Sequence, residues 1–191
     1  GVSGNGQTEL LHTLVGLMKA DSGEILLNGK NICGLDVRSI RDAGCAYVPE
    51  DRNTMGAALS ATLMETMMMA HQYEKELNNH GVLRYKTAEE RFTALLSEYD
   101  VKYSSLSQKA GELSGGNLQK LIVAREVSHC AKLLVISEPT RGVDIGAMEF
   151  IHNQIIAQRA SGAAILLVSS DLSEVLKLSD RIYVMYVGRI Q

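Results

Sequence analysis

The first eight residues, Gly-Val-Ser-Gly-Asn-Gly-Gln-Thr, have a composition that suits the binding of a polyphosphate. Glycines allow consecutive backbone N–H groups to surround phosphate oxygens, and a helix that starts directly behind them adds about half a positive charge. The glycine spacing and the final hydroxyl are those of a phosphate-binding loop, in which Thr8 would contact Mg²⁺. An ordinary glycine-rich turn between a strand and a helix would have the same composition.

Gln7 occupies the position at which a phosphate-binding loop normally carries lysine. Lysine places a positive charge on the outer phosphates, so its loss is expected to weaken binding by about 1.5 to 3 kcal/mol, the value of a charge-assisted hydrogen bond. This loop is therefore expected to hold phosphate less tightly than one with the lysine.

A second segment that suits an anion is Ser114-Gly115-Gly116, which precedes a helical pattern of apolar residues. The serine can cap the helix, and the two glycines leave backbone donors uncovered at its start. A plain helix cap would use the same residues, so the segment alone does not identify a ligand site.

Two polar segments follow continuous apolar runs. Glu138 comes after the run 133–136, and Ser170 comes after the run 163–168. Runs without alternation are typical of strands buried on both faces of a parallel sheet, whose carboxyl ends form the ligand-binding edge. Glu138 can orient a water molecule for attack on a phosphate there, or it can pair with a neighbouring arginine.

The elements that position these residues alternate between strands and helices, which predicts an α/β fold with right-handed crossovers and a layered parallel sheet. A small antiparallel ribbon with an Asn-Gly turn is expected over 24–32, and a strand over 45–48, stopped by Pro49. Helices are expected directly after the glycine loop, before residue 44, after residue 116, over 145–159 and over 172–178, and a bent strand pair over 182–190.

Residues 58–112 differ in sequence pattern from the rest of the chain. They contain no pattern typical of strands, and Met64, Met67, Met68 and Met69 cluster there. The segment is predicted to be an all-helical subdomain inserted into a core formed by 1–57 and 113–191. The methionines are interpreted first as flexible core packing. The alternative, which follows from the family resemblance described below, is a groove for a short cytoplasmic helix of a membrane subunit.

Composition excludes several classes of protein. The chain has 191 residues and a net charge of −3 with no block of like charge, so its sequence lacks the concentration of positive charge that nucleic-acid binding requires. Its three cysteines lack a CxxC spacing, which argues against a disulfide framework. It contains no apolar run of 18 residues, and it opens on glycines without an initiator Met, so we expect an N-terminally truncated fragment of a longer polypeptide.

The order of these segments along nearly the whole chain resembles the nucleotide-binding domain of ABC transporters, a P-loop NTPase with a RecA-like core and a helical signature subdomain. The matching segments are Gly-Asn-Gly-Gln-Thr-Glu, Pro-Glu-Asp-Arg, Leu-Ser-Gly-Gly-Asn, Pro-Thr-Arg-Gly-Val-Asp and Val-Ser-Ser-Asp. They are most similar to the second, degenerate half of the tandem ATPase subunits that serve simple-sugar and nucleoside importers. Gln7 favours the nucleoside branch.

The resemblance implies that two ATP-binding halves close head to tail, so that one half builds parts of two sites. Ser114, Gly115 and Gly116 would complete the site of the partner half. Glu138 and Ser170 would occupy the catalytic positions, and Thr8 with Glu50 would hold Mg²⁺. The residues that would hold the ATP of this half are Gly1, Ser3, Gly4, Asn5, Gly6, Gln7 and Thr8.

Four departures from the family pattern fall on this half's own site. They are Gln7 for lysine, Ser137 for the strand carboxylate, Glu50 for glutamine and Ser170 for the switch histidine. Phosphoryl transfer depends on positioning and on charge at the outer phosphates, so these changes are expected to slow hydrolysis by orders of magnitude. The signature helix departs only at Asn117, so the opposite site is expected to work.

The resemblance further implies an ATPase at the cytoplasmic face of the cell membrane. Its partners would be a second ATP-binding half, in the same chain or a second copy, the integral membrane permease subunits and, indirectly, an extracellular solute-binding protein, with no nucleic acid. Two alternatives are a non-catalytic regulatory half and a soluble ABC ATPase of DNA repair or translation. The absence of a coiled-coil insertion and of basic arms argues against the soluble class.

Overall fold

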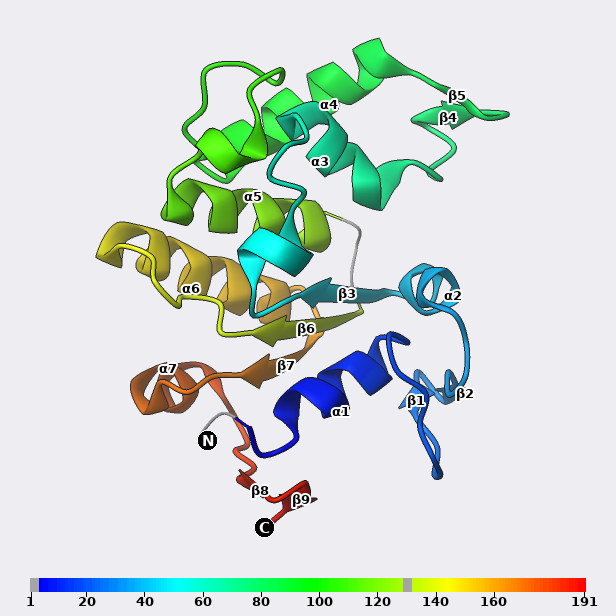
Figure 1. Ribbon diagram of the computed structural model, residues 1–191, viewed down its shortest axis with the longest axis vertical. Helices are drawn as coiled ribbons and strands as arrows, with labels where there is room; N and C mark the ends of the chain where they lie inside the picture. The colour runs from blue at the N-terminus through cyan, green and yellow to red at the C-terminus, as the bar shows by residue number, and fades with distance from the viewer. Residues whose placement is uncertain (1–3, 129–131) are drawn as a thin grey trace. The chain divides into compact units, whose positions relative to one another are not determined.

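A computed structural model describes residues 4–128 and 132–191 (Figure 1). The chain folds as two compact units. Unit 1 consists of Gly1–Tyr47, Ala131–Glu138 and Ile155–Gln191, and unit 2 consists of Val48–Cys130 and Pro139–Gln154. Glu138 and Ser170 therefore belong to unit 1 together with the glycine loop, whereas Glu50 and the Ser114–Gly116 segment belong to unit 2.

A three-stranded sheet with the order β3-β6-β7 forms the centre of unit 1. β6 (Leu133–Ser137) and β7 (Ala164–Val168) pair in parallel. Leu133 lies opposite Ala164 at the start of the pair, and Ser137 lies opposite Val168 at its end. β3 (Cys45–Val48) ends at Pro49, as predicted. The last four residues of β6 are buried, which confirms the prediction of a central strand covered on both faces.

The prediction of a second fully buried strand over 163–168 was wrong in one respect. β7 forms there, but Ala164 is exposed and the residues after it are only half-buried. The reason is position, because β7 pairs with β6 and lies at an edge of the sheet within the described part of the chain.

Helix α1 (Gln7–Leu14) packs its buried Leu11, together with Val15, against Ile32, Ile40 and Val135 of unit 1. Further elements of unit 1 are α2 (Val37–Asp42), α7 (Leu172–Leu178) and two short antiparallel pairs, β1 (Leu26–Leu27) with β2 (Lys30–Asn31) and β8 (Met185–Tyr186) with β9 (Arg189–Ile190). Asn28 and Gly29, with φ of 51° and 75°, form the tight turn predicted between β1 and β2.

Unit 2 is mainly helical and is built around α5 (Gly115–Val127), which is buried from Leu118 to Val127. The other elements of the unit are α3 (Leu63–His71), α4 (Tyr85–Glu98), the π-helical turn η1 (Arg52–Gly56), the 3₁₀ turn η2 (Ala110–Glu112) and the start of α6 (Ile145–Ala160). It also contains the short antiparallel pair β4 (Asn78–Asn79) and β5 (Val82–Leu83). The sequence had predicted only helices there, because two-residue strands carry no periodicity.

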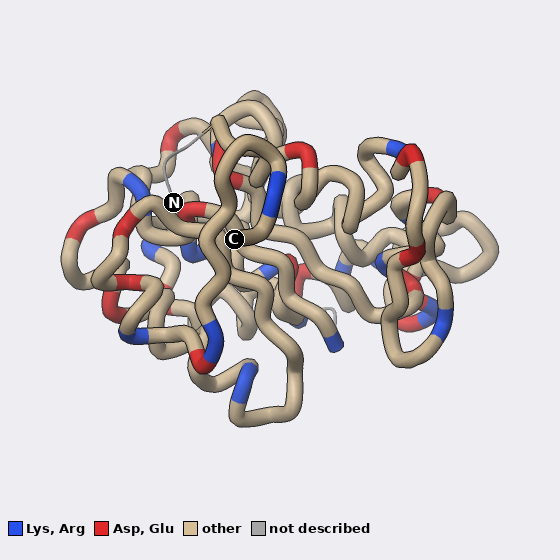
Figure 2. Tube along the Cα trace, turned by 90° about the horizontal axis from the view of Figure 1, so that it is seen from below, with Lys and Arg blue, Asp and Glu red and all other residues tan. Residues whose placement is uncertain are grey.

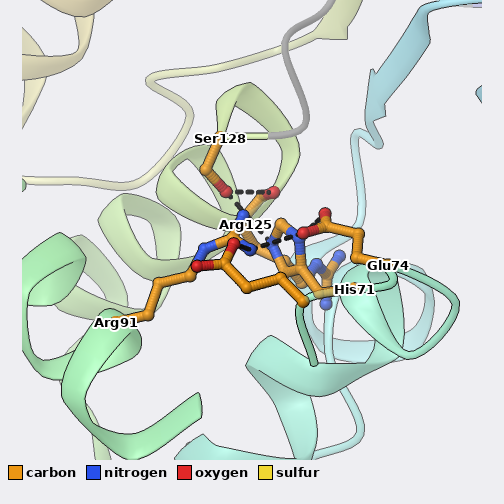
Figure 3. A network of polar contacts seen from close by, with 6 residues as sticks. His71, Glu74, Arg91, Arg125 and Ser128 are labelled. Carbon is orange, nitrogen blue, oxygen red and sulfur yellow. Dashed lines mark hydrogen bonds and ion pairs between the residues drawn. The ribbon is translucent and has the colours of Figure 1, made fainter. Parts of the chain in front are cut away.

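A buried polar network joins three helices of unit 2 (Figure 3). The His71 side chain is fully buried, with Nδ1 2.5 Å from Glu74 Oε1 and Nε2 3.1 Å from Ser128 Oγ. Glu74 also pairs with Arg91 of α4, and Ser128 Oγ donates to the carbonyl of Arg125. These contacts satisfy a histidine that would otherwise be costly to bury.

Two of the four clustered methionines, Met67 and Met68, are buried in unit 2. Met64 is half-buried, and 46% of Met69 is exposed. The burial of Met67 and Met68 fits their interpretation as core packing.

Candidate functional site

The glycine loop of unit 1 has the backbone that a phosphate-binding loop needs. Gly4 and Gly6 have φ of +84° and +100°, in the left-handed region that glycine adopts without strain. Helix α1 begins directly at Gln7, and no side chain caps it. Its first-turn amides therefore point toward the loop, where an anion can accept from them. The predicted contacts of Gly1 and Ser3 lie outside the described residues.

The turn between β8 and β9 holds this loop in place. Val187 N donates to Asn5 Oδ1 at 3.0 Å, and Gly188 N donates to the Asn5 carbonyl at 2.9 Å. A Cβ on Gly6 would lie 3.2 Å from Gly188 Cα, so the two backbones approach closely. No local pattern in the sequence predicted this support, because Asn5 and Val187 lie 182 residues apart.

Gln7 turns its side chain back onto the loop. Its Oε1 accepts a hydrogen bond of 2.9 Å from the backbone amide of Asn5. One N–H of the loop therefore binds a neighbouring carboxamide in this structure, and an incoming phosphate would compete with Gln7 for it.

Glu138 and Ser170 meet at the carboxyl ends of β6 and β7. Ser170 N and Ser170 Oγ donate to the two carboxylate oxygens of Glu138 at 2.6 and 2.9 Å. Glu138 has φ of +47°, a conformation that is uncommon for a residue with a side chain and is concentrated at functional sites. Its backbone amide is fixed by the carbonyl of Val168 at 2.8 Å. The structure therefore brings together the two residues predicted at the catalytic positions.

The residues of unit 1 fit a phosphate chain better than they fit a metal ion. Ser137, at the end of β6, is 4% exposed and offers a hydroxyl where a carboxylate would bind a cation more strongly. The exposed Thr8 would contribute one hydroxyl, leaving most ligands to the phosphates and water. Among residues 4–128 and 132–191, no group of three or more His, Cys, Asp or Glu side chains could hold a metal.

In unit 2, Ser114 caps α5. Its Oγ accepts from Asn117 N at 3.4 Å and from Asn117 Nδ2 at 3.0 Å. A Cβ on Gly116 would lie 2.8 Å from Asp144 Oδ2 and 3.0 Å from Ala147 Cβ, so this glycine is required for the close packing of α5 on α6. Asp144 in turn caps α6, since its Oδ1 accepts from Ala147 N at 2.9 Å.

Glu50, predicted to bind metal, pairs with Arg141, whose Nη1 donates to Glu50 Oε1 at 2.6 Å. The neighbouring Arg52 crosses to the same loop, where Nη1 donates to the Arg141 carbonyl at 2.6 Å and Nη2 to the Gly142 carbonyl at 3.2 Å. Neither arginine was predicted from the sequence to have a role of its own. About 90 residues separate the partners, so no local pattern indicated these contacts.

Figure 2 shows acidic and basic residues interspersed along the described trace, without a large block of one sign. No helix in the described part of the chain is long and apolar enough to cross a membrane.

Comparison with protein families gives a match over residues 1–141 to the family described as "ABC transporter". Among curated proteins, the chain is 43% identical over 190 residues to the guanosine import ATP-binding protein NupO of Bacillus subtilis. It is 41% identical over 191 residues to the nucleoside import ATP-binding protein NupA of Lactococcus lactis, and 42% identical over 192 residues to the glucose import ATP-binding protein TsgD13 of Haloferax volcanii. All of this chain is covered in each case, but it spans only 37%, 38% and 35% of those relatives.

Solved structures share the fold. A dimeric ATP-binding cassette in a post-hydrolysis state with ADP and Pi aligns with a TM-score of 0.83 at 19% identity, covering 100% of this chain and 81% of that one. A nucleotide-free ATP-binding cassette from an ABC transporter aligns with a TM-score of 0.77 at 23% identity, covering 100% of this chain and 76% of that one. These similarities confirm the predicted α/β cassette fold.

Proposed function

The chain belongs to the ABC transporter family of ATP-binding domains, and on that premise we propose that it is the second, degenerate nucleotide-binding half of an importer ATPase. In this proposal its own ATP site turns over slowly or not at all. Its main role is to supply the Ser114-Gly115-Gly116 segment that completes the ATP site of a partner half.

The observation that supports the proposal is the contrast between the two anion-binding segments. Ser114 caps α5, a helix that is buried from Leu118 to Val127. In unit 1, by contrast, Gln7 accepts a hydrogen bond from an amide of its own loop, and Ser137 replaces a carboxylate. The same chain therefore combines an intact helix cap with a weakened phosphate loop.

The position of Glu138 supports slow turnover at this half's own site. A general base must aim a free lone pair at the attacking water, within about 3 Å of it. Two donors from Ser170 occupy one acceptor position on each carboxylate oxygen of Glu138 and fix the side chain toward the end of β7, so a water could bind only at the remaining lone pairs. ATP would still bind through the amides of Gly4 to Thr8, with Mg²⁺ held by Thr8 and the phosphates. Glu50, the other predicted ligand, is paired with Arg141.

The substrate class comes from the relatives, which are named for the import of guanosine, nucleosides and glucose. We propose that the complete protein serves an importer of nucleosides or simple sugars at the cytoplasmic face of the membrane. Its partners would be the other ATP-binding half, the integral membrane permease subunits and, indirectly, an extracellular solute-binding protein.

The experiment uses the full-length subunit with its permease in membrane vesicles. Ser114→Tyr places a bulky ring at the start of α5 and is expected to abolish ATP-driven transport. Glu138→Gln keeps the size of the side chain and one oxygen to accept from Ser170 N, and is expected to change turnover by less than about threefold, whereas the matching change in the other half should reduce it by orders of magnitude. If both glutamate variants are equally inactive, the proposed asymmetry is wrong.

The second candidate is a regulatory half that binds ATP without hydrolysing it. It is favoured by the contact of Gln7 with Asn5 and by the two hydrogen bonds from Ser170 to the Glu138 carboxylate. Single-turnover measurements with the other half disabled distinguish the two. Slow release of phosphate from this half indicates a weak ATPase. Retention of intact ATP over many transport cycles indicates a regulator.

A further inference from the structure

We propose that Arg52 is a positioning residue that holds the loop 139–142 and the start of α5 in one arrangement, which the ATP site of the partner half needs for turnover. This inference rests on the proposed function of Ser114-Gly115-Gly116. It adds a residue that reaches that site only through its neighbours.

The backbone of Arg52 is placed by the turn it begins. Asp51 caps η1, accepting from Asn53 N at 2.9 Å, from Thr54 N at 3.3 Å and from Thr54 Oγ1 at 2.6 Å. The Thr54 hydroxyl, followed by the amide of Asn53, lowers the pKa of the Asp51 carboxyl, because each bond favours its charged form. The cap therefore stays ionised, and the turn well defined, at neutral pH.

The turn η1 also packs against α5. A Cβ on Gly56, at the other end of η1, would lie 2.7 Å from Ile122 Cδ1, so this glycine packs closely against α5. Gly56 is buried, as is Ile122. Arg52 is thus carried by a turn whose position is set by α5 itself.

From this turn the guanidinium of Arg52 reaches two other segments. Its Nη1 and Nη2 donate to the carbonyls of Arg141 and Gly142 at 2.6 and 3.2 Å. The Cβ position of Gly115 lies 3.1 Å from the same Nη2, which places the guanidinium against the first residue of α5. A planar fork with several donors can bridge two carbonyls in this way, whereas an ammonium group cannot reproduce the geometry.

A second contact closes the arrangement. Arg141 Nη1 donates to Glu50 Oε1 at 2.6 Å, so the segment 50–52 and the loop 139–142 hold each other by two crossed contacts. The loop then runs to Asp144, against which Gly116 packs. Loss of Arg52 would remove the link between the Arg141 and Gly142 carbonyls and the first residue of α5, while leaving the Glu50–Arg141 contact and the helix cap at Ser114 in place.

Positioning predicts a particular kinetic signature. Nucleotide binding by the partner half depends mainly on that half's own phosphate loop, so the KM for ATP should change little. Turnover requires the Ser114-Gly115-Gly116 segment to be correctly positioned against the ATP of the partner half, and small displacements of such a segment reduce reaction rates strongly. We therefore expect Arg52→Gln to reduce kcat about tenfold or more, and the KM for ATP to change less than about threefold.

The test measures ATP hydrolysis and transport by the full-length subunit with its permease, with rates expressed per folded subunit. The variants are Arg52→Gln, Arg52→Lys and the matched control Arg84→Gln, which removes the same charge at the exposed start of α4. The control is expected to behave as wild type. Arg52→Lys keeps the charge without the fork and is expected to recover only part of kcat.

Three results overturn the inference. One is a normal kcat in Arg52→Gln while Ser114→Tyr is inactive. Another is full recovery by Arg52→Lys, which would make charge alone sufficient. The third is a loss of folded subunit with normal kcat per folded molecule, which would make Arg52 merely structural. Full activity of Ser114→Tyr would instead overturn the proposed function itself.

Discussion

Ser170 donates two hydrogen bonds to the carboxylate of Glu138, one from its amide at 2.6 Å and one from its hydroxyl at 2.9 Å. The two residues lie 32 positions apart and follow adjacent parallel strands. The contact fixes the side chain of a residue whose backbone already has an unusual φ of +47°. Such a combination of backbone strain and side-chain constraint persists only where the surrounding structure enforces it.

The strain at Glu138 can be measured with two substitutions in the full-length subunit. Glu138→Ala and Glu138→Gly both lose the bonds to Ser170, but only glycine adopts a positive φ without a Cβ penalty. We expect the glycine variant to be more stable by about 1 kcal/mol, measured by urea unfolding. At Glu89, an exposed position inside α4, the order should reverse, because glycine weakens a helix. If the alanine variant at position 138 is as stable as the glycine variant, the positive φ of Glu138 does not strain the backbone.

The sequence predicted the fold well where local patterns determine structure. The apolar run before Ser137 required a buried strand, and Asn28-Gly29 required a tight turn. It predicted the strand β7 but not its exposure, which depends on the strands that lie beside it. It also missed β4 and β5, which are too short for a periodic signal.

The candidate site was predictable only as separate pieces. Phosphate-loop glycines and a serine at a helix start are recognisable because their chemistry is local. The support of Asn5 by Val187 and the reach of Arg52 to Gly142 join residues far apart in the chain, and nothing in either neighbourhood encodes the partner. The contact of Gln7 with Asn5 N depends on a side-chain rotamer, which the spacing of the loop residues does not predict.

The contact of Gln7 with its own loop makes a second prediction. Gln7→Met releases the amide of Asn5 at similar side-chain length, and Gln7→Lys also adds a positive charge. ATP binding by this half should strengthen slightly in the methionine variant and about ten- to a hundredfold in the lysine variant, as expected for a charge-assisted bond.

The measurement of the Gln7 variants is a titration with a fluorescent ATP analogue, using full-length subunits in which the other half's phosphate loop has been disabled. Wild type with the same disabled half is the reference. Equal affinities for wild type and Gln7→Lys would show that the missing lysine does not limit binding.

A third prediction concerns Gly116. An alanine there would place Cβ 2.8 Å from Asp144 Oδ2 and 3.0 Å from Ala147 Cβ, and the second atom belongs to a helix that cannot easily move. We expect Gly116→Ala to lower the free energy of unfolding by about 1 to 3 kcal/mol and to reduce ATP hydrolysis. Gly146→Ala is the matched control, since its Cβ meets only Asp144 Oδ1, at 3.3 Å. A stability loss of the same size in both variants would contradict the packing explanation.

Tyr99 gives a prediction about pH. Burial, with a smaller effect from Glu98, raises the pKa of Tyr99 to about 12, compared with about 10 in an unfolded chain. The folded state therefore favours the neutral phenol, so this contribution to stability is complete below pH 10 and is lost as the pH rises from 10 to 12. Tyr99→Phe keeps the ring against Phe150, at 6.0 Å between centroids, but removes the ionisable hydroxyl.

Urea unfolding of the full-length subunit between pH 9 and pH 12 tests this sign. Wild type should lose up to about 2 kcal/mol more than Tyr99→Phe over that range, because the variant has no phenol to ionise on unfolding. Lysines and other tyrosines also titrate there, so only the difference between the two proteins is informative. Tyr85→Phe, at a tyrosine that is 62% exposed, should follow the wild-type curve. If Tyr99→Phe also follows it, the phenol of Tyr99 ionises as easily in the folded protein as in the unfolded chain.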